Sequence, residues 1–236
     1  MVLPSDKDYL LSKKIKLEES EISADFTELA EWIENHYQVK VLNIIYREET
    51  GKEIIPKLNI VLEYGKDKIK FEDKDRSGYD KQKQDAITKQ FLKILEEKGL
   101  RKKRSLLNYF SKHSNEKYLT KNLWIFFSAF EPIAKMEASK NLTKSKIDKF
   151  KTDLDDENLW EISIAFESPT FFLYKDDQIK EYESNGRKEE WKNKYFEVIN
   201  QFDEFNYFKK ETLSISIDSK ENFDTNYESN WYYYYK

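Results

Sequence analysis

Oxygen-bearing side chains alternate along residues 73–78, whose sequence Asp-Lys-Asp-Arg-Ser-Gly has the spacing of the first half of a calcium-binding loop. In such loops the ligands at positions 1, 3 and 5 converge on the ion, and glycine at position 6 permits the sharp turn. Position 12, where a bidentate glutamate should complete the coordination, is Gln84, and position 8, usually apolar, is Asp80. We therefore expect no metal here but a polar turn in which Asp80 caps the next helix. A metal-dependent hydrolase using Asp73 and Asp75 is the weakest function that the sequence suggests.

A second candidate site is the one basic cluster of the chain, in residues 98–104. Its four consecutive cations are Arg101, Lys102, Lys103 and Arg104. Such density is typical of phosphate contacts, and aromatic residues shortly after it could stack on bases. The formal net charge of −4 opposes a dedicated nucleic-acid domain, so cations at a solvated helix end are the simpler interpretation. Binding or processing of nucleic acid is the alternative function.

The third candidate is the acidic second half of the chain. Residues 121–236 carry 17 basic and 23 acidic side chains, a net charge of −6, whereas residues 1–120 have a net charge of +2 from 24 basic and 22 acidic ones. Aromatic residues are interleaved with these acids, which is typical of a surface that attracts a basic protein and anchors it by aromatic burial. The simpler alternative is that the acids face water and the aromatic residues form the core. The residues that we expect to contact such a partner are Asp155, Asp156, Asp176, Asp177, Tyr182 and Tyr227. We expect the two tyrosines to be exposed, because neither falls on a helical or strand stripe.

Several classes of site are excluded by composition. The chain has no cysteine, only two histidines and no glycine-rich phosphate-binding spacing, so thiolate, zinc-thiolate and common nucleotide sites have no ligands. No nucleophile motif occurs, and carboxylates are too abundant for any pair to be singled out. We expect no catalytic residue and no cofactor, which favours a binding protein over an enzyme. The N-terminus lacks an apolar leader and no apolar run approaches 20 residues, so we expect a cytoplasmic protein without a membrane segment.

The elements that position these residues follow from hydrophobic periodicity. Apolar residues at helical spacing predict helices over residues 23–37, 81–98, 105–119, 143–154 and 187–205. Alternation and β-formers predict strands over residues 39–47, 57–64, 68–72, 122–130, 133–138, 160–166, 171–175, 213–217 and 230–236. We expect 122–130 to be central in its sheet, since both of its faces are apolar.

The fold class is therefore α+β, with antiparallel β-hairpins covered by amphipathic helices. The order helix, strand, strand, helix, strand occurs twice, so the chain is interpreted as an N-terminal segment (1–22) and two similar halves, 23–138 and 143–236, packed as one body. Duplication and chance explain this order equally well. For function, the acidic and aromatic second half indicates a partner-binding protein, most concretely an immunity-type inhibitor of a basic toxin such as a nuclease.

Overall fold

The computed structural model describes residues 3–51, 53–75, 77–102, 117–165 and 168–236, and it divides the chain into two compact units. Unit 1 comprises residues 1–133 and unit 2 comprises residues 134–236. Each unit contains a mixed three-stranded sheet and its own hydrophobic core, which makes the protein α+β, as predicted. The boundary lies inside one helix, α5 (Phe130–Asn141).

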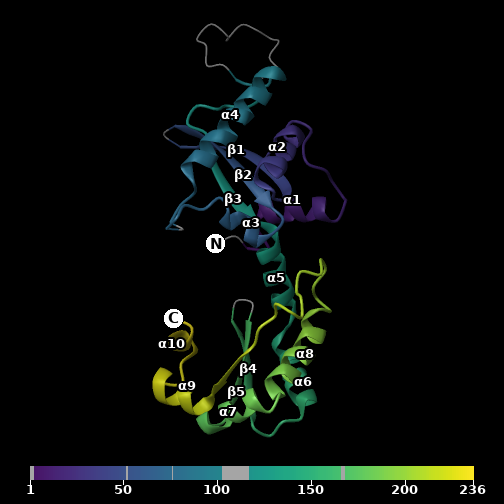
Figure 1. The fold of residues 1–236 in the computed structure, drawn as a ribbon, viewed down its shortest axis with the longest axis vertical. Coiled ribbons are helices and arrows are strands. Elements are labelled where there is room, and N and C mark those ends of the chain that lie inside the picture. The colour runs from purple at the N-terminus through teal and green to yellow at the C-terminus, as the bar shows by residue number, and fades with distance from the viewer. Residues whose placement is uncertain (1–2, 52, 76, 103–116, 166–167) are drawn as a thin grey trace. The chain divides into compact units, whose positions relative to one another are not determined.

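The sheet of unit 1 is built on a long hairpin. Strands β1 (Val41–Thr50) and β2 (Ile54–Leu62) are antiparallel, and β3 (Trp124–Ala129) pairs with β2 in parallel, so β2 is central. Apolar side chains alternate along each strand, and one face packs against α2 (Thr27–Tyr37) and α4 (Lys81–Glu97) to form the core (Figure 1). The opposite face carries polar side chains that bond to α1 (Lys7–Lys16): Asn43 reaches Ser12, and Asn59 reaches Asp8.

Unit 2 repeats this topology. Strands β4 (Leu159–Ala165) and β5 (Ser168–Leu173) are antiparallel, and β6 (Ser216–Ser219) pairs with β5 in parallel. Helices α6 (Lys144–Leu154) and α8 (Arg187–Ile199) supply the core on one face. Two C-terminal helices, α9 (Lys220–Tyr227) and α10 (Trp231–Tyr234), bring aromatic rings onto the other face.

The two units share more than the order of their elements. A short helix follows the second strand in each unit, α3 (Gly65–Ile69) in one and α7 (Asp176–Ser184) in the other. Glu131 donates its N–H to the carbonyl of the residue after β2 (2.9 Å), and its carboxylate accepts from the first N–H of α3 (3.0 Å). Glu221 makes the same two bonds, to the residue after β5 (3.3 Å) and to the first N–H of α7 (3.2 Å). These bonds fix the same connection in both units.

Several predicted elements differ from the structure. The strand predicted over residues 68–72 is wrong, since α3 (Gly65–Ile69) covers its first part. Residues 133–138 belong to α5, because Pro132 lies in the first helical turn, where the backbone N–H that proline lacks would have no helical partner. The prediction that residues 122–130 are central in their sheet is wrong, since β3 pairs with β2 alone in the sheet of the described residues and Trp124 on its second apolar face is 46% exposed. The helix predicted over residues 105–119 lies almost wholly outside the described residues.

Two further differences concern the chain ends. The predicted strand at residues 230–236 is wrong, since α10 forms there and its rings pack on β5: Trp231 and Tyr234 lie 5.2 and 5.1 Å from the ring of Phe172. The N-terminal segment 1–22 contains α1, whose Tyr9 is buried and stacks on Phe130 (4.9 Å). Both ends of the chain thus cover the second face of a sheet.

Candidate functional site

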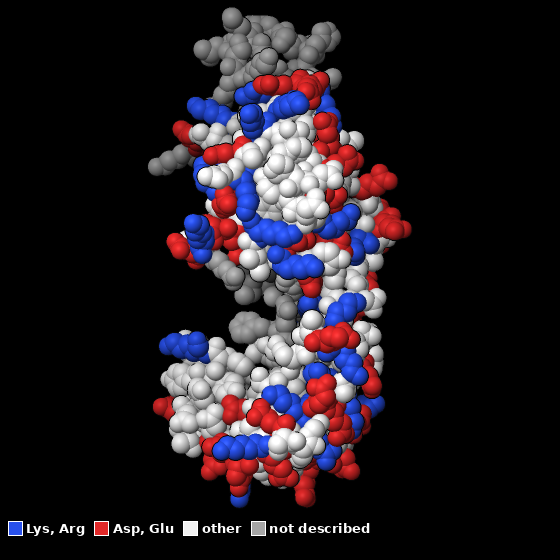
Figure 2. Space-filling view, in the orientation of Figure 1, with Lys and Arg blue, Asp and Glu red and all other residues white. Residues whose placement is uncertain are grey.

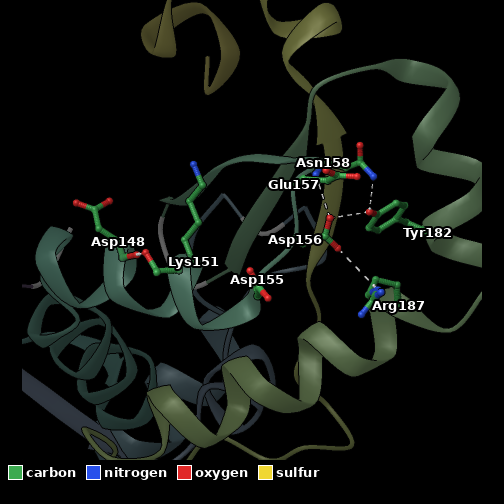
Figure 3. A pocket seen from close by; sticks show the side chains of 9 residues that line it. Asp148, Lys151, Asp155, Asp156, Glu157, Asn158, Tyr182 and Arg187 are labelled. Atoms are coloured by element: carbon green, nitrogen blue, oxygen red, sulfur yellow. Dashed lines mark hydrogen bonds and ion pairs between the residues drawn. The ribbon is translucent and has the colours of Figure 1, made fainter.

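An acidic pocket of about 800 Å³ opens in unit 2 between the end of α6, the segment leading to β4 and the start of α8. We refer to it as the acidic groove. Figure 3 shows its side chains, with the Asp156 carboxylate facing both Tyr182 and Arg187. Nine residues line the groove: Asp148, Lys151, Thr152, Asp155, Asp156, Glu157, Asn158, Tyr182 and Arg187.

The local backbone explains how so many polar groups converge. Helix α6 ends at Asp155, which adopts a left-handed conformation (φ 48°, ψ 51°) that stops the helix and turns the chain toward β4. Asparagine and aspartate tolerate this conformation better than most residues with a side chain. The three residues after Asp155 therefore project beside the helix end before the strand begins at Leu159.

Asp156 is the most constrained side chain of the groove, with a side chain only 6% exposed. Its Oδ1 accepts hydrogen bonds from the Tyr182 hydroxyl (2.8 Å) and the Asn158 N–H (3.1 Å). Its Oδ2 lies 3.8 Å from Arg187 Nε, which is beyond hydrogen-bond distance. The buried carboxylate thus has one oxygen occupied and the other weakly partnered (Figure 3).

The electrostatics of the groove favour a cation. Four acidic residues line the groove with two basic ones, and Asp148 pairs with Lys144 (2.8 Å). The two bases have partners as well: Lys151 donates to the Trp160 carbonyl, and Arg187 donates to Glu190 (3.0 Å). The C-terminal end of α6 adds partial negative charge. In Figure 2, acidic side chains gather at the end of unit 2 where α7 lies.

Two more carboxylates of the groove, Asp155 and Glu157, are exposed, and no ion pair to either is found among the described residues. Their charges are therefore open to a ligand. Burial raises the pKa of the Tyr182 hydroxyl above its ordinary value, and the hydrogen bond to Asp156 acts in the same direction. Tyr182 therefore stays protonated at neutral pH and remains a donor to Asp156.

Three of the six residues predicted to bind a partner, Asp155, Asp156 and Tyr182, meet in this groove. Asp176 and Asp177 lie in the first turn of α7 and do not line it. The expectation that Tyr182 is exposed is wrong: it is 6% exposed and packs on Trp191, because α7, a helix that sequence periodicity missed, turns it inward.

The other tyrosine of the predicted set, Tyr227, is half-buried at the end of α9, with its ring 4.9 Å from that of Tyr234. Asn158, Lys151 and Arg187 were not predicted as site residues. The consecutive acids after an amphipathic helix were the only signal in the sequence, since these three residues join the groove through the fold.

The basic cluster is described in part, because Lys103 and Arg104 lie outside the described residues. Arg101 forms an ion pair with Glu96 and donates to the Thr120 hydroxyl (3.1 Å), and Lys102 pairs with Glu48 (3.1 Å). Both described members of the four consecutive cations therefore already bind side chains of unit 1.

The calcium-like segment forms a turn held by its own side chains. Asp73 accepts from the N–H (2.9 Å) and the hydroxyl (3.3 Å) of Ser77, and Gln84 donates to the Ile125 carbonyl (2.5 Å). Asp80 caps α4 by accepting from two N–H groups of its first turn, as predicted. Within the described part of the chain, no group of three or more His, Cys, Asp or Glu side chains could hold a metal ion.

Comparison with protein-family models, with curated proteins and with solved structures found no match for this chain. No helix among the described residues has the length and apolar character needed to cross a membrane.

Proposed function

We propose that this chain is a binding protein for a basic partner protein, and most concretely an immunity-type inhibitor of a basic toxin such as a nuclease. The observation that carries the proposal is the acidic groove, where Asp155, Asp156 and Glu157 surround a concave site at a helix C-terminus. A cationic side chain is the complement of such a site.

A toxin that cleaves nucleic acid fits this site because its own substrate is a polyanion. Enzymes of that kind gather lysine and arginine where phosphates bind, and an acidic protein that covers those cations competes with the substrate. Such inhibition needs no catalytic residue, and none is part of the proposal. We place the complex in the cytoplasm, where a toxin of this class would meet its substrate.

The alternative, nucleic-acid binding through residues 98–104, has less support because Arg101 and Lys102 already pair with carboxylates. A phosphate would have to displace Glu96 and Glu48 to reach them. Nucleic-acid binding is therefore an outcome that the following experiment detects.

The test is affinity capture from a lysate of the source organism, compared between two double variants. Asp155→Lys with Glu157→Lys reverses the open charges of the acidic groove. Glu211→Lys with Glu228→Lys makes the same change at exposed residues of unit 2 outside the groove. Captured proteins are identified by mass spectrometry, purified, and assayed for nuclease activity with and without the chain.

We expect a basic protein to be retained by the wild-type and control chains and lost from the groove variant. Its nuclease activity should fall to background at a 1:1 ratio of chain to enzyme. Retention by the groove variant, or capture of nucleic acid alone, would overturn the proposal.

A further inference from the structure

Unit 1 contains a pocket of about 530 Å³ at the position that corresponds to the acidic groove of unit 2. It lies at the end of α2, beside the start of β1 and α3. Helix α2 ends at Gln38 with φ 53° and ψ 56°, close to the values at Asp155. The register of the hairpin shifts directly after its first residue pair in both units, after Val41 and after Leu159. The two pockets are therefore structural counterparts.

Lysines of the chain itself line the unit 1 pocket and lie at the end of α2. Lys70 donates from Nζ to the carbonyl oxygen of Gln38 (2.7 Å) and pairs with Asp67 (3.0 Å). Lys40 pairs with Glu34 (3.3 Å). An ammonium group thus rests on the carbonyl that ends α2, where the helix dipole favours positive charge.

The counterparts of these lysines in unit 2 carry no positive charge. Strands β2 and β5 end at Leu62 and Leu173, and counting from these residues places Glu181 at the position of Lys70. Counting back from the start of β4 places Asn158 at the position of Lys40. Unit 2 therefore has no cation at these two positions, and the cations that line its groove, Lys151 and Arg187, come from α6 and α8 instead.

The connection into the first strand also differs. Two residues separate Gln38 from β1, whereas three separate Asp155 from β4. The extra residue permits Asp156 to enter the groove, where its buried carboxylate presents Oδ2. Unit 2 thus places a buried carboxylate at the helix end where unit 1 places lysines.

We propose that the acidic groove binds a lysine side chain of the partner, in the position that Lys70 occupies in unit 1. Its ammonium group donates to the carbonyl oxygen of Asp155 and to Oδ2 of Asp156. This inference rests on the proposed function and adds the chemical class of the group that is bound.

Lysine is favoured over arginine because of the oxygens that the groove offers. A guanidinium group binds best to two oxygens of one carboxylate, in a planar fork. Oδ1 of Asp156 already accepts two hydrogen bonds, so a ligand would bind to Oδ2, with which Arg187 makes only a 3.8 Å ion pair. An ammonium group has three donors that can be directed separately at a carbonyl and at a single carboxylate oxygen.

Amide chemical shifts of the full-length chain test this directly. The probes are n-butylammonium, which matches a lysine side chain, n-propylguanidinium, which matches arginine, and tetramethylammonium, which has charge but no N–H donor. We expect saturable shifts at residues 155–158 with n-butylammonium, and an affinity at least about threefold weaker with each of the other two. Equal affinity for tetramethylammonium, or no saturable shift, would overturn the inference.

Two variants locate the site. Glu181→Lys should reproduce the arrangement of unit 1 by filling the groove from within, and so weaken n-butylammonium binding at least about tenfold. Asp156→Asn should weaken it to a similar degree without adding a side chain that blocks the groove. Glu197→Lys is the matched control, because Glu197 is an exposed residue of α8 outside the groove. Wild-type affinity in Glu181→Lys with a folded spectrum would refute the assignment.

The outcome separates this inference from the proposed function. If n-butylammonium binds as expected but no basic protein does, the lysine site stands and the proposed function fails. If a captured basic protein binds Glu181→Lys and Asp156→Asn as tightly as wild type, the function stands and the lysine site is wrong.

Discussion

The hydroxyl of Tyr182 helps to hold the Asp156 carboxylate in place, and removing that one hydroxyl measures how much the hydrogen bond stabilises the fold. Phenylalanine should fit at this position, because the counterpart in unit 1, by the same count from the strand ends, is the fully buried Phe71. Tyr182→Phe should lower the free energy of unfolding by about 1–2 kcal/mol, since it removes one of two hydrogen bonds to a buried carboxylate. Urea unfolding measures this, and a loss above about 4 kcal/mol would indicate a role in packing instead.

Asp25 gives a prediction at acid pH. Hydrogen bonds from Lys117 Nζ (2.9 Å) and the Tyr118 hydroxyl (2.8 Å) lower the pKa of its carboxyl below the ordinary value. A lowered pKa in the folded state means that the carboxylate stabilises the fold above the unfolded-state pKa, and that this stability is lost as pH falls through the folded-state pKa.

Asp25→Asn should therefore destabilise the protein at pH 7, and the difference from wild type should shrink below about pH 4. Urea unfolding between pH 7 and pH 2.5 measures it. Asp75→Asn, at an exposed aspartate, is the control. A difference that stays constant over this pH range would show that the ionised form of Asp25 is not what stabilises the fold.

Residue chemistry alone could identify part of the site. Asp155 and Asp156 were predicted as acids of the aromatic-rich second half of the chain, and they do line the groove. Tyr182 was selected for the wrong reason, because the polar composition of α7 hides its helical stripe. The sequence alone did not predict that Arg187 and Asn158 lie beside Tyr182, because only the folded chain brings these residues together.

At the scale of elements, the edge of β3 is protected by side chains from elsewhere in unit 1. The Tyr79 hydroxyl donates to the Phe127 carbonyl (2.9 Å), and Gln84 donates to the Ile125 carbonyl. These carbonyls would otherwise be open acceptors at a sheet edge, which invites pairing with another chain.

Removing both donors, by Tyr79→Phe with Gln84→Ala, should therefore promote self-association. Sedimentation velocity at increasing protein concentration should show dimers or larger species that the wild type lacks. Gln82→Ala, at an exposed residue of the same helix, is the control. A variant that stays as monomeric as wild type would show that these two bonds do not protect the edge.

Local sequence predicted some elements better than others. Helix α4 was located closely because Asp80 caps it and its buried residues keep a regular helical spacing. The C-terminal aromatic residues have high β propensity yet form α10, because ring contacts of Trp231 with Trp160 and Phe172, and of Tyr234 with Phe172, decide their conformation. Secondary-structure propensity is therefore overridden where contacts with residues distant in the sequence stabilise another conformation.

At the scale of the whole molecule, the excess of acidic residues in the second half of the chain should control the association rate of a basic partner. From residue 155 onward the chain has 10 basic and 19 acidic side chains, a net charge of −9. Exposed charges attract a partner over a distance that salt reduces to about 10 Å at 0.1 M.

The association rate with the captured partner should thus fall steeply as salt rises, whereas the dissociation rate changes little. Reversing Asp177 to lysine should slow association further and leave stability within about 1 kcal/mol, because its side chain is exposed, whereas Asp176 accepts a hydrogen bond from the buried Ser219 hydroxyl. Stopped-flow kinetics at several salt concentrations measures this. An association rate that does not depend on salt would place the interface away from the acidic half.

The repeated order of elements was visible in the sequence, but the repeated bonds were not. Helix, strand, strand, helix and strand follow one another twice in the hydrophobic pattern, and the two sheets have the same topology. The paired roles of Glu131 and Glu221 depend on hydrogen bonds to short helices that the pattern did not predict. Common ancestry of the two units stays a prediction.

Because Asp155 has a left-handed backbone conformation, the residue that would be most stable at this position is not the one that would bind a cation best. Glycine adopts that conformation without the steric penalty of a β-carbon, so Asp155→Gly would relieve strain at the end of α6 and remove a charge from the groove. At Gln38, the corresponding end of α2, the same change would remove no acidic charge. Selection for stability alone would therefore favour glycine at both positions, and an aspartate kept at 155 would mark a site that selection maintains for its ligand.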